Sequence, residues 1–428
     1  GSGKTVVALA TLLVAVQGGY QGAIMAPTEV LAEQHYLSTV DALESAGLAP
    51  EGGPDASGTG SLFAREAAPD VRVAILTANR AITNFGGNAD RSAVTGWIAD
   101  GVVDIVIGTH ALIQEGVHFG RLGIAVVDEQ HRFGVHQRVM LRDKAADHDP
   151  DLLIMTATPI PRTLSMTLYG DLDVSILDEL PPGRQPVATR HVPKDPESLA
   201  AVHDLVRSEV AAGRQAFVVC PLVEDSTKME AKSASAEYER LKSVYPALRL
   251  GLLHGQMRPS EKDEVMHRFR AGDLDILVAT TVIEVGIDVA NATVMVIEDA
   301  DRFGLSQLHQ LRGRVGRGAD AATCLLVAEP KTSDGEERIA AMVATNDGFR
   351  LAEEDMRIRG QGTVFGARQS GMTDLRLADL LRDVDSLIAA RREAFGLVQS
   401  DPGLVNHPEL AEEVHALLGE DAEWLERS

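Results

Sequence analysis

Short apolar runs alternate with longer mixed segments along the first part of the chain. The runs are GAIMAP, RVAILT, VDIVIGT, GIAVVDE and DLLIMTAT. They are apolar throughout and rich in Val and Ile, which is typical of strands covered on both faces. Because segments long enough for helices separate them, the pattern predicts a parallel sheet with helices on its faces.

The pattern changes twice farther along. After about residue 180, the stretch ELPPGRQPVATR has the Pro and Gly content of a linker. Apolar runs then resume as QAFVVCP, RLGLLH, DILVATT, ATVMVIED and ATCLLVAE, which predicts a second α/β domain, although the sequence does not show directly that it repeats the first. Past about Lys331, segments rich in Glu, Arg and Leu predict a mainly helical end. We therefore expect domains at residues 1–180, 181–345 and 346–428.

Composition limits the classes of protein that fit this pattern. With 428 residues and 45% hydrophobic content, the chain can bury more than one core. Its formal net charge of −23 argues against a nucleic-acid binder. There is no apolar stretch of about 18 residues and no leader-like start, so we expect a cytoplasmic protein with no membrane partner. Cys220 and Cys324 adjoin apolar runs and are expected to be reduced core residues.

The first five residues, GSGKT, match the end of the phosphate-loop pattern G-x-x-x-x-G-K-[ST]. Glycine lets backbone N–H groups approach phosphate oxygens, and the N-terminus of a following helix adds positive charge. Lys4 would reach the β- and γ-phosphates of a nucleotide, and the Thr5 hydroxyl would ligate Mg²⁺. The alternative is a chance glycine turn before a helix, because the first glycine of the pattern is not present.

Two adjacent acids end the run GIAVVDE. An acid at the carboxyl end of a buried strand is where Mg²⁺ held by a phosphate loop needs a second anchor. Asp128 is the candidate anchor, and Glu129 is the candidate base that orients the attacking water. Adjacent carboxylates also occur in solvated turns, but the phosphate-loop motif upstream favours the functional interpretation.

Glycines separate three arginines in HQLRGRVGRG, at Arg312, Arg314 and Arg317. Glycine inside an exposed helix costs about 1 kcal/mol, so its presence here indicates a close approach of the backbone to another group. Guanidinium groups suit the charge of a phosphoryl-transfer transition state, and the three arginines are candidate arginine fingers from the second domain. A basic surface turn explains the same pattern equally well.

These motifs, together with TATPIPRTL, resemble those of superfamily 2 helicases and translocases. Longer stretches such as DEQHRFGVHQR, MTATPIPRTLSMTLYGDLDVSILDELPPGR and ADRFGLSQLHQLRGRVGRG resemble the RecG family of branched-DNA helicases, from residue 1 to about residue 410. The resemblance implies an α/β fold of two tandem RecA-like parallel-sheet domains followed by a mainly helical C-terminal segment. It also implies an ATP-dependent, Mg²⁺-requiring monomer that acts on branched or forked DNA in repair and recombination, with single-strand-binding protein as a candidate partner.

The resemblance also implies roles for individual residues. Those expected at the nucleotide and its Mg²⁺ are Gly1, Ser2, Gly3, Lys4, Thr5, Asp128, Glu129, Gly286, Asp288, Gln310, Arg314 and Arg317. Those expected to contact DNA, or to couple it to the nucleotide, are Pro27, Thr28, Thr109, His131, Thr156, Thr158, Thr281, Glu284, Arg359 and Gln369. The last two lie in segment 351–371, which resembles the translocation motif of the family.

Members of this family carry a long N-terminal region with a wedge domain, an adenine-reading segment and a strand before the phosphate loop. Since this chain begins inside that loop, we expect a motor fragment whose first sheet lacks a strand and whose nucleotide affinity is low. Much of the fork-binding surface would lie in that region, which answers the objection from net charge. Two alternatives stay open: the translocase of the transcription-repair coupling factor, which shares much of this sequence, and a catalytically impaired DNA-binding fragment.

Overall fold

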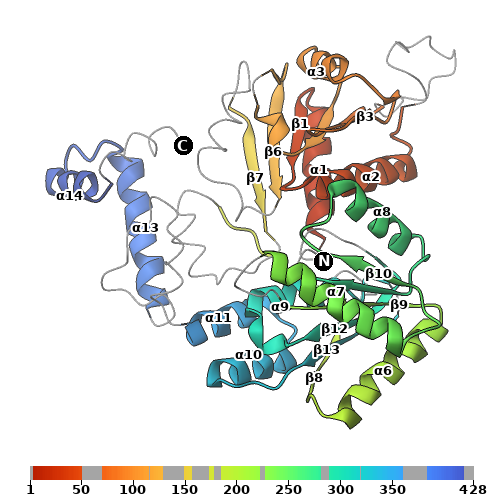
Figure 1. Ribbon diagram of the computed structural model, residues 1–428. Helices are drawn as coiled ribbons and strands as arrows, with labels where there is room; N and C mark the ends of the chain where they lie inside the picture. The colour runs from red at the N-terminus through yellow and green to blue at the C-terminus, as the bar shows by residue number, and fades with distance from the viewer. Residues whose placement is uncertain are drawn as a thin grey trace. The chain divides into compact units, whose positions relative to one another are not determined.

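The computed structural model describes residues 3–50, 70–114, 116–128, 149–156, 173–177, 185–221, 227–280, 289–318, 320–359 and 383–418. The chain divides into two compact units, Ser2–Ala157 and Thr158–Glu426, which we call the first and second unit. Each unit is built on one sheet with helices packed against it (Figure 1). The boundary expected near residue 180 falls outside the described residues, and the limits of the three domains stay predictions.

The first unit has a sheet with the strand order β4-β3-β2-β5-β1-β6-β7 among its described residues. Its elements are α1 (Lys4–Gln17), β1 (Gln21–Met25), α2 (Glu29–Ala46), β2 (Val73–Leu76), β3 (Ala81–Thr83), β4 (Gly87–Asn88), α3 (Arg91–Ala99), β5 (Ile105–Gly108), the 3-10 turn η1 (His110–Leu112), β6 (Leu122–Asp128) and β7 (Asp151–Met155). The strands from β2 to β7 in this order pair in parallel, and β3 and β4 add to one edge in antiparallel pairs. Every residue of β1, β2 and β5 is buried, as their uninterrupted apolar sequences predicted.

The second unit has a wholly parallel sheet with the order β10-β11-β9-β12-β13-β8 among its described residues. Its elements are β8 (Ala188–Val192), α6 (Pro196–Ala211), β9 (Gln215–Val219), α7 (Thr227–Val244), β10 (Leu250–Leu253), α8 (Pro259–Arg270), β11 (Ile276–Ala279), β12 (Ala292–Glu298), the 3-10 turn η4 (Ala300–Arg302), α9 (Leu305–Arg312), β13 (Thr323–Val327), α10 (Ser333–Ala344), α11 (Gly348–Arg359), α13 (Val384–Ser400) and α14 (Pro408–Leu418). After β13 the described residues hold only helices, which confirms the predicted helical C-terminal segment.

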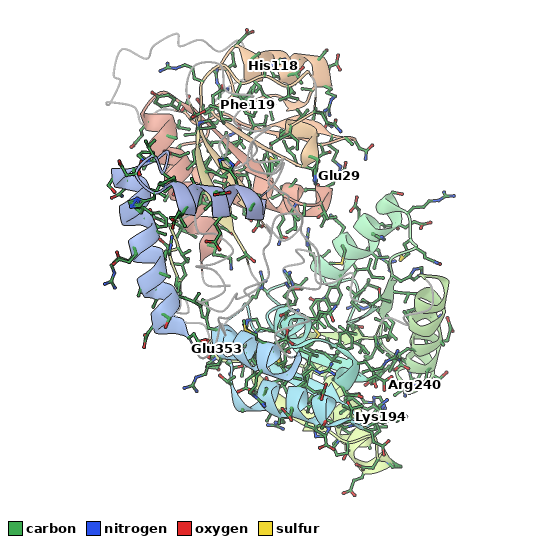
Figure 2. The ribbon with its side chains drawn as sticks, turned by 90° about the vertical axis from the view of Figure 1, so that its left-hand side faces the viewer. Glu29, His118, Phe119, Lys194, Arg240 and Glu353 are labelled. Carbon is green, nitrogen blue, oxygen red and sulfur yellow. The ribbon has the colours of Figure 1, made fainter. Side chains whose placement is uncertain are left out.

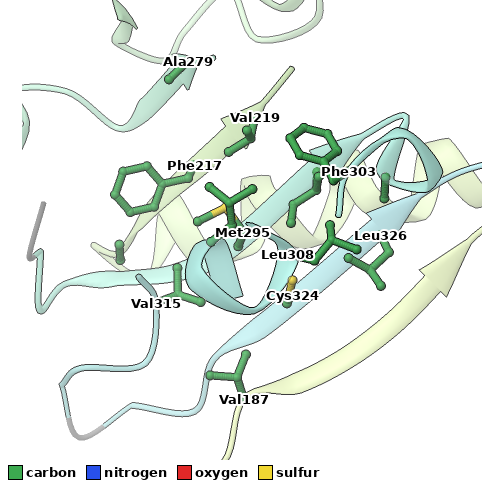
Figure 3. Close-up of a cluster of buried hydrophobic side chains, with 14 of the residues drawn as sticks. Val187, Phe217, Val219, Ala279, Met295, Phe303, Leu308, Val315, Cys324 and Leu326 are labelled. Carbon is green, nitrogen blue, oxygen red and sulfur yellow. The ribbon is translucent and has the colours of Figure 1, made fainter. Parts of the chain in front are cut away.

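The second unit has two buried hydrophobic clusters, one that includes residues of α9 and one that includes residues of α6 and α7. Phe217 and Met295 on the central strands face Leu308 of α9, and Cys324 lies beside them on β13 (Figure 3). Both cysteines are free thiols that are buried in the core, as predicted. Burial raises the pKa of Cys324 to about 12 and that of Cys220 well above its ordinary value, so both stay protonated.

The two sheets share a set of equivalent side-chain hydrogen bonds that the sequence analysis did not predict. Gln21 begins β1 and Gln215 begins β9, and the side-chain amide of each donates to two buried backbone carbonyls beside the neighbouring strand. The acceptors and N–O distances are Ile98 at 2.9 Å and Val103 at 2.7 Å in the first unit, and Phe269 at 2.6 Å and Leu274 at 2.7 Å in the second. The two α/β halves therefore repeat one design, down to the bond that fixes the central strand.

An aspartate that precedes the next strand repeats in the same way. Asp104 before β5 accepts from the backbone N–H of Arg72 at 2.7 Å, and Asp275 before β11 accepts from that of Arg249, also at 2.7 Å. Each bond ties the start of one strand to the start of its parallel neighbour. The pairs QGAIMAP and QAFVVCP, and VDIVIGT and LDILVAT, are the sequence traces of this repeat.

Candidate functional site

Helix α1 begins at the residues predicted to hold phosphate. Gly3 is its N-terminal cap with a φ of 88°, in the left-handed region that favours glycine, and Lys4 and Thr5 form the first turn. The helix lies close against the sheet, because a Cβ added at Gly22 of β1 would come within 2.3 Å of Leu12. Since a short turn joins the end of α1 to the start of β1, Lys4 and Thr5 lie toward the carboxyl edge of the parallel strands.

The other predicted site residues of the first unit follow strand ends. Asp128 is the last residue of β6, Pro27 and Thr28 follow β1, Thr109 follows β5, and Thr156 follows β7. These four strands are parallel neighbours, so their carboxyl ends meet at one edge of the sheet. The fold thus gathers at this edge residues that are far apart in the sequence.

The two described threonines predicted to touch DNA have local roles as well. The Thr28 hydroxyl accepts from the backbone N–H of Leu31 at 3.3 Å and caps α2. The Thr109 hydroxyl accepts from Ala111 at 3.5 Å and caps η1. Both bonds stabilise the starts of the helices, and DNA contact by the same residues stays a prediction.

Asp128 has a partner that the sequence analysis did not identify. Nε2 of His35, on α2, lies 2.9 Å from Oδ2 of Asp128, with side chains 9% and 14% exposed. A carboxylate only accepts hydrogen bonds, so Nε2 carries the hydrogen. The available signal was a histidine on the buried face of α2, where a polar ring requires a partner.

The chemistry of this edge fits a nucleotide with a hard divalent cation. Lys4 supplies an ammonium group, the first turn of α1 contains no acidic residue, and Thr5 and Asp128 supply oxygen ligands. Among the described residues there is no group of three or more His, Cys, Asp or Glu side chains placed to hold a metal. Mg²⁺ usually takes one or two protein ligands together with substrate phosphates, and Thr5 and Asp128 are the candidates for that role.

The predicted phosphate-sensing residues of the second unit differ from Arg312 in burial. Gln310, Arg314 and Arg317 are half-buried on α9 and just after it, and Nε of Arg317 donates to the carbonyl of Gly313 at 3.1 Å. Arg312 instead faces inward and is 3% exposed. The interpretation of Arg312 as a candidate arginine finger is therefore wrong, because its guanidinium group is buried and hydrogen-bonded within the second unit. The resemblance implied that role only for Arg314 and Arg317.

Arg312 fastens α9 to the helices that follow β13. Its Nη1 donates to the carbonyls of Met342 at 3.0 Å and Thr345 at 2.8 Å, at the end of α10. Nη2 lies 3.1 Å from Nδ1 of His309. Burial lowers the pKa of Arg312, but these acceptors take up its hydrogens and make it a structural anchor.

A second acidic cluster lies at the end of β12 in the second unit. Burial, and then repulsion by Glu237, raise the pKa of Glu298 to about 7, while Arg240 and Lys194 oppose the shift. Lys194 is paired with Asp299. Burial acts to lower the pKa of Lys194, but that pair outweighs it and raises the value. Arg240 and Lys194 lie on the same side of the second unit in Figure 2.

Several predicted residues cannot be placed. Outside the described residues lie Gly1, Ser2, Glu129, His131, Thr158, Thr281, Glu284, Gly286, Asp288 and Gln369. Arg359 is the last residue of α11, and only its backbone is described. The roles of all these residues stay predictions.

Comparison with known proteins adds to this geometry. Three family profiles match in order: DEAD/DEAH box helicase at residues 1–167, helicase conserved C-terminal domain at residues 197–319, and ATP-dependent DNA helicase RecG, domain 3, C-terminal, at residues 345–418. The chain is 47% identical over 402 residues to the ATP-dependent DNA helicase RecG of Bacillus subtilis, covering 94% of this chain and 54% of that one. Over the length it shares with such proteins, the chain belongs to the RecG family.

Further RecG proteins agree in sequence and in structure. The RecG of Synechocystis is 46% identical over 411 residues, which cover 96% of this chain and 46% of that protein. A solved structure of RecG bound to a three-way DNA junction is 42% identical with a TM-score of 0.66, over 90% of this chain and 46% of that one. The chain thus spans about half the length of the RecG proteins it matches. Among the described residues, no helix has the length and apolar character needed to cross a membrane.

Proposed function

We propose that this chain is the motor part of an ATP-dependent DNA translocase or helicase that acts on branched DNA. The observation that carries the proposal is the match to RecG proteins over nearly the whole chain, with the residues expected for nucleotide binding at one edge of the first sheet. The relative solved with a three-way DNA junction supports branched DNA as the substrate class. Stalled forks and Holliday junctions are the expected forms of that DNA.

Each candidate residue of the nucleotide site has a role in this proposal. Lys4 and the N-terminus of α1 bind the β- and γ-phosphates of ATP. Thr5 and Asp128 would hold Mg²⁺, which would supply positive charge to offset the negative charge of the phosphates. Glu129 orients the attacking water, and Arg314 and Arg317 supply positive charge to the transferring phosphoryl group. Pro27, Thr28, Thr109 and Thr156 are the proposed DNA-side contacts and coupling residues of the first unit.

The C-terminal segment favours this family over the coupling translocase. Residues 345–418 match the profile of RecG domain 3, C-terminal, and this match begins just after α10 and continues to the end of α14. The alternative function, a translocase that displaces RNA polymerase, is supported only by the motor motifs that the two families share. Single-strand-binding protein as a partner, a monomeric state and a place in the bacterial cytoplasm are parts of the proposal that rest on the family alone.

The test is ATP hydrolysis by the 428-residue chain with a three-way junction, a Holliday junction or linear duplex of equal length. We expect hydrolysis that rises most with the branched DNAs and disappears in Lys4→Ala, which removes the phosphate-binding ammonium group. Hydrolysis that ignores DNA, or that survives in Lys4→Ala, would refute the motor proposal. DNA binding without any hydrolysis would instead support the impaired DNA-binding fragment.

A further inference from the structure

Helix α2 reaches the nucleotide edge through one side chain. Nε2 of His35 lies 2.9 Å from Oδ2 of Asp128, a contact between residues 93 positions apart. Both side chains are largely enclosed, so bulk water competes little for the bond. This bond connects the end of β6 to a helix that begins at the residues proposed to contact DNA.

The first turns of α2 are also fastened to a neighbouring loop. Glu29 accepts from Nδ2 of Asn79, with distances of 3.1 Å and 3.2 Å to its two carboxylate oxygens. Glu33, one turn later, is paired with Arg80 of the same loop. Helix α2 is therefore held by this loop near its start and by Asp128 at His35.

We propose that His35 is a positioning residue for Asp128, and that α2 passes the state of the DNA-side residues to the nucleotide site through this bond. The inference rests on the proposed function. Mg²⁺ demands near-ideal octahedral geometry, so a carboxylate that anchors it must hold one orientation. A hydrogen bond from a neighbouring group fixes that orientation, and loss of such a bond typically costs about 10–100-fold in metal affinity or activity.

His35→Leu removes the bond and keeps an apolar side chain of similar size in the core. We expect the Mg²⁺ concentration for half-maximal ATP hydrolysis to rise about tenfold, and kcat at limiting Mg²⁺ to fall about 10–100-fold. The KM for ATP at saturating Mg²⁺ stays within about twofold, because Lys4 and α1 are untouched. The stimulation of hydrolysis by junction DNA falls in the same variant.

A conservative variant and a matched control separate positioning from packing. His35→Gln places an amide N–H near the original Nε2 and is expected to restore the Mg²⁺ dependence, whereas the shorter His35→Asn is not. Thr39→Val alters another buried polar residue of α2, one turn along, and is expected to leave the Mg²⁺ dependence unchanged. The Gln and Asn variants keep the test decisive if the Leu variant does not fold.

The outcomes are distinguishable from failure of the proposed function. A parent chain without DNA-stimulated, Mg²⁺-dependent hydrolysis refutes that function, and the inference with it. An active parent whose His35→Leu and His35→Asn variants share its Mg²⁺ dependence, with only a lower Tm, refutes the positioning role alone. If the variants change the Mg²⁺ dependence but not the stimulation of hydrolysis by DNA, His35 positions Asp128, and the proposed coupling of the DNA-side residues through α2 is refuted.

Discussion

The two sheet units share a scaffold, but they differ at the helix that precedes the first shared strand. Gln21 and Gln215 mark matching positions, which pairs α1 with α6. Helix α1 starts at Gly3 with no side-chain cap and no acid in its first turn. Helix α6 starts at Asp195, whose carboxylate accepts from the backbone N–H of Ser198 at 2.9 Å. The anion-binding end of α6 thus holds the carboxylate of the chain itself, which leaves α1 as the helix suited to a phosphate ligand.

The two units also differ at the acidic residue that ends the matching strands, Asp128 of β6 and Glu298 of β12. The strand registers, in which Gly22 pairs with Ile124 and Ala216 with Val294, place Asp128 and Glu298 at equivalent positions. Asp128 is held in one orientation by the hydrogen bond with His35. Glu298 is buried near Glu237 and Arg240 of α7 and near the pair Lys194–Asp299, and burial together with repulsion by Glu237 raises its pKa to about 7. The repeat therefore shows one copy whose strand-end acid is oriented by a histidine at the nucleotide edge, and one whose strand-end acid is buried among charged side chains of its own unit.

The outer strands also differ. In the second unit β8 pairs with the outer side of β13, and Cys324, Leu325 and Leu326 are buried. In the first unit the equivalent strand, β7, is the outermost strand of the described sheet, and its Leu152–Ile154 segment is only half-buried.

The sharpest test of the comparison exchanges acids at matched positions. Glu129→Gln should lower ATP turnover by about 10⁴-fold, the upper range for a general base, while nucleotide binding stays near that of the parent. Asp299→Asn, at the matching position of the second unit, should leave turnover within about twofold, since that position is balanced internally and Asn tolerates its φ of 47°. Single-turnover hydrolysis and binding of a fluorescent ATP analogue measure both. Equal effects of the two changes would mean that the units do not differ in this way.

A second test compares two arginines of one motif. Arg317→Ala should lower turnover on saturating junction DNA by about 10³-fold and leave DNA affinity nearly unchanged, as expected for an arginine finger. Arg312→Ala should instead lower the Tm of the second unit, because it leaves the buried carbonyls of Met342 and Thr345 without their donor. Loss of DNA binding in Arg317→Ala, with normal hydrolysis, would place Arg317 in a phosphate-backbone contact.

The repeated glutamine offers a test in which the two units should respond alike. Gln21→Leu and Gln215→Leu each remove a donor from two buried carbonyls. The carbonyls of Ile98 and Phe269 keep a backbone donor, from Gly101 and Gly272, so the main loss is at Val103 and Leu274. We expect each change to lower the free energy of unfolding of its own unit by about 1–3 kcal/mol, the cost of one unsatisfied buried group. Hydrogen exchange followed by mass spectrometry reports each unit separately. A loss in one unit only would show that the shared bond has no shared energetic role.

The features of this fold that the sequence predicts are those that depend on local sequence patterns. The buried strands, the helical C-terminal segment and the two buried cysteines follow from uninterrupted apolar runs and from where those runs stop. The glycine at the start of α1 follows from the need of a phosphate loop for a left-handed residue. In each case the residue type and its immediate neighbours are enough to decide the structure.

The parts that the sequence did not reveal depend on tertiary contacts. Arg312 and Arg317 look equivalent in RGRVGR, and the contact with the end of α10 distinguishes Arg312 as the one that faces inward. His35 looks like an ordinary helix residue until β6 places Asp128 against it. The repeat was hidden because its marks are single residues, Gln21 with Gln215 and Asp104 with Asp275, separated by segments of different length.

The smallest predicted effect concerns the ionisation of Glu298 and the stability of the second unit as a function of pH. The pKa of Glu298 is about 7 in the folded chain and near 4.5 when unfolded, so the folded state binds its proton more tightly. The stability linked to this group is fully present below about pH 4.5 and is lost as the pH rises through about 7. Glu298→Gln removes the ionisation, and should therefore raise the stability of the second unit at pH 8 by about 1–2 kcal/mol relative to the parent, with little change at pH 5.

Calorimetric Tm values from pH 5 to pH 8 measure this effect, with Glu353→Gln as an exposed control on α11 (Figure 2). If the parent and Glu298→Gln lose stability equally as the pH rises, Glu298 is not the buried acid of this cluster, and the second unit tolerates charge at the end of β12 as the first unit does at Asp128.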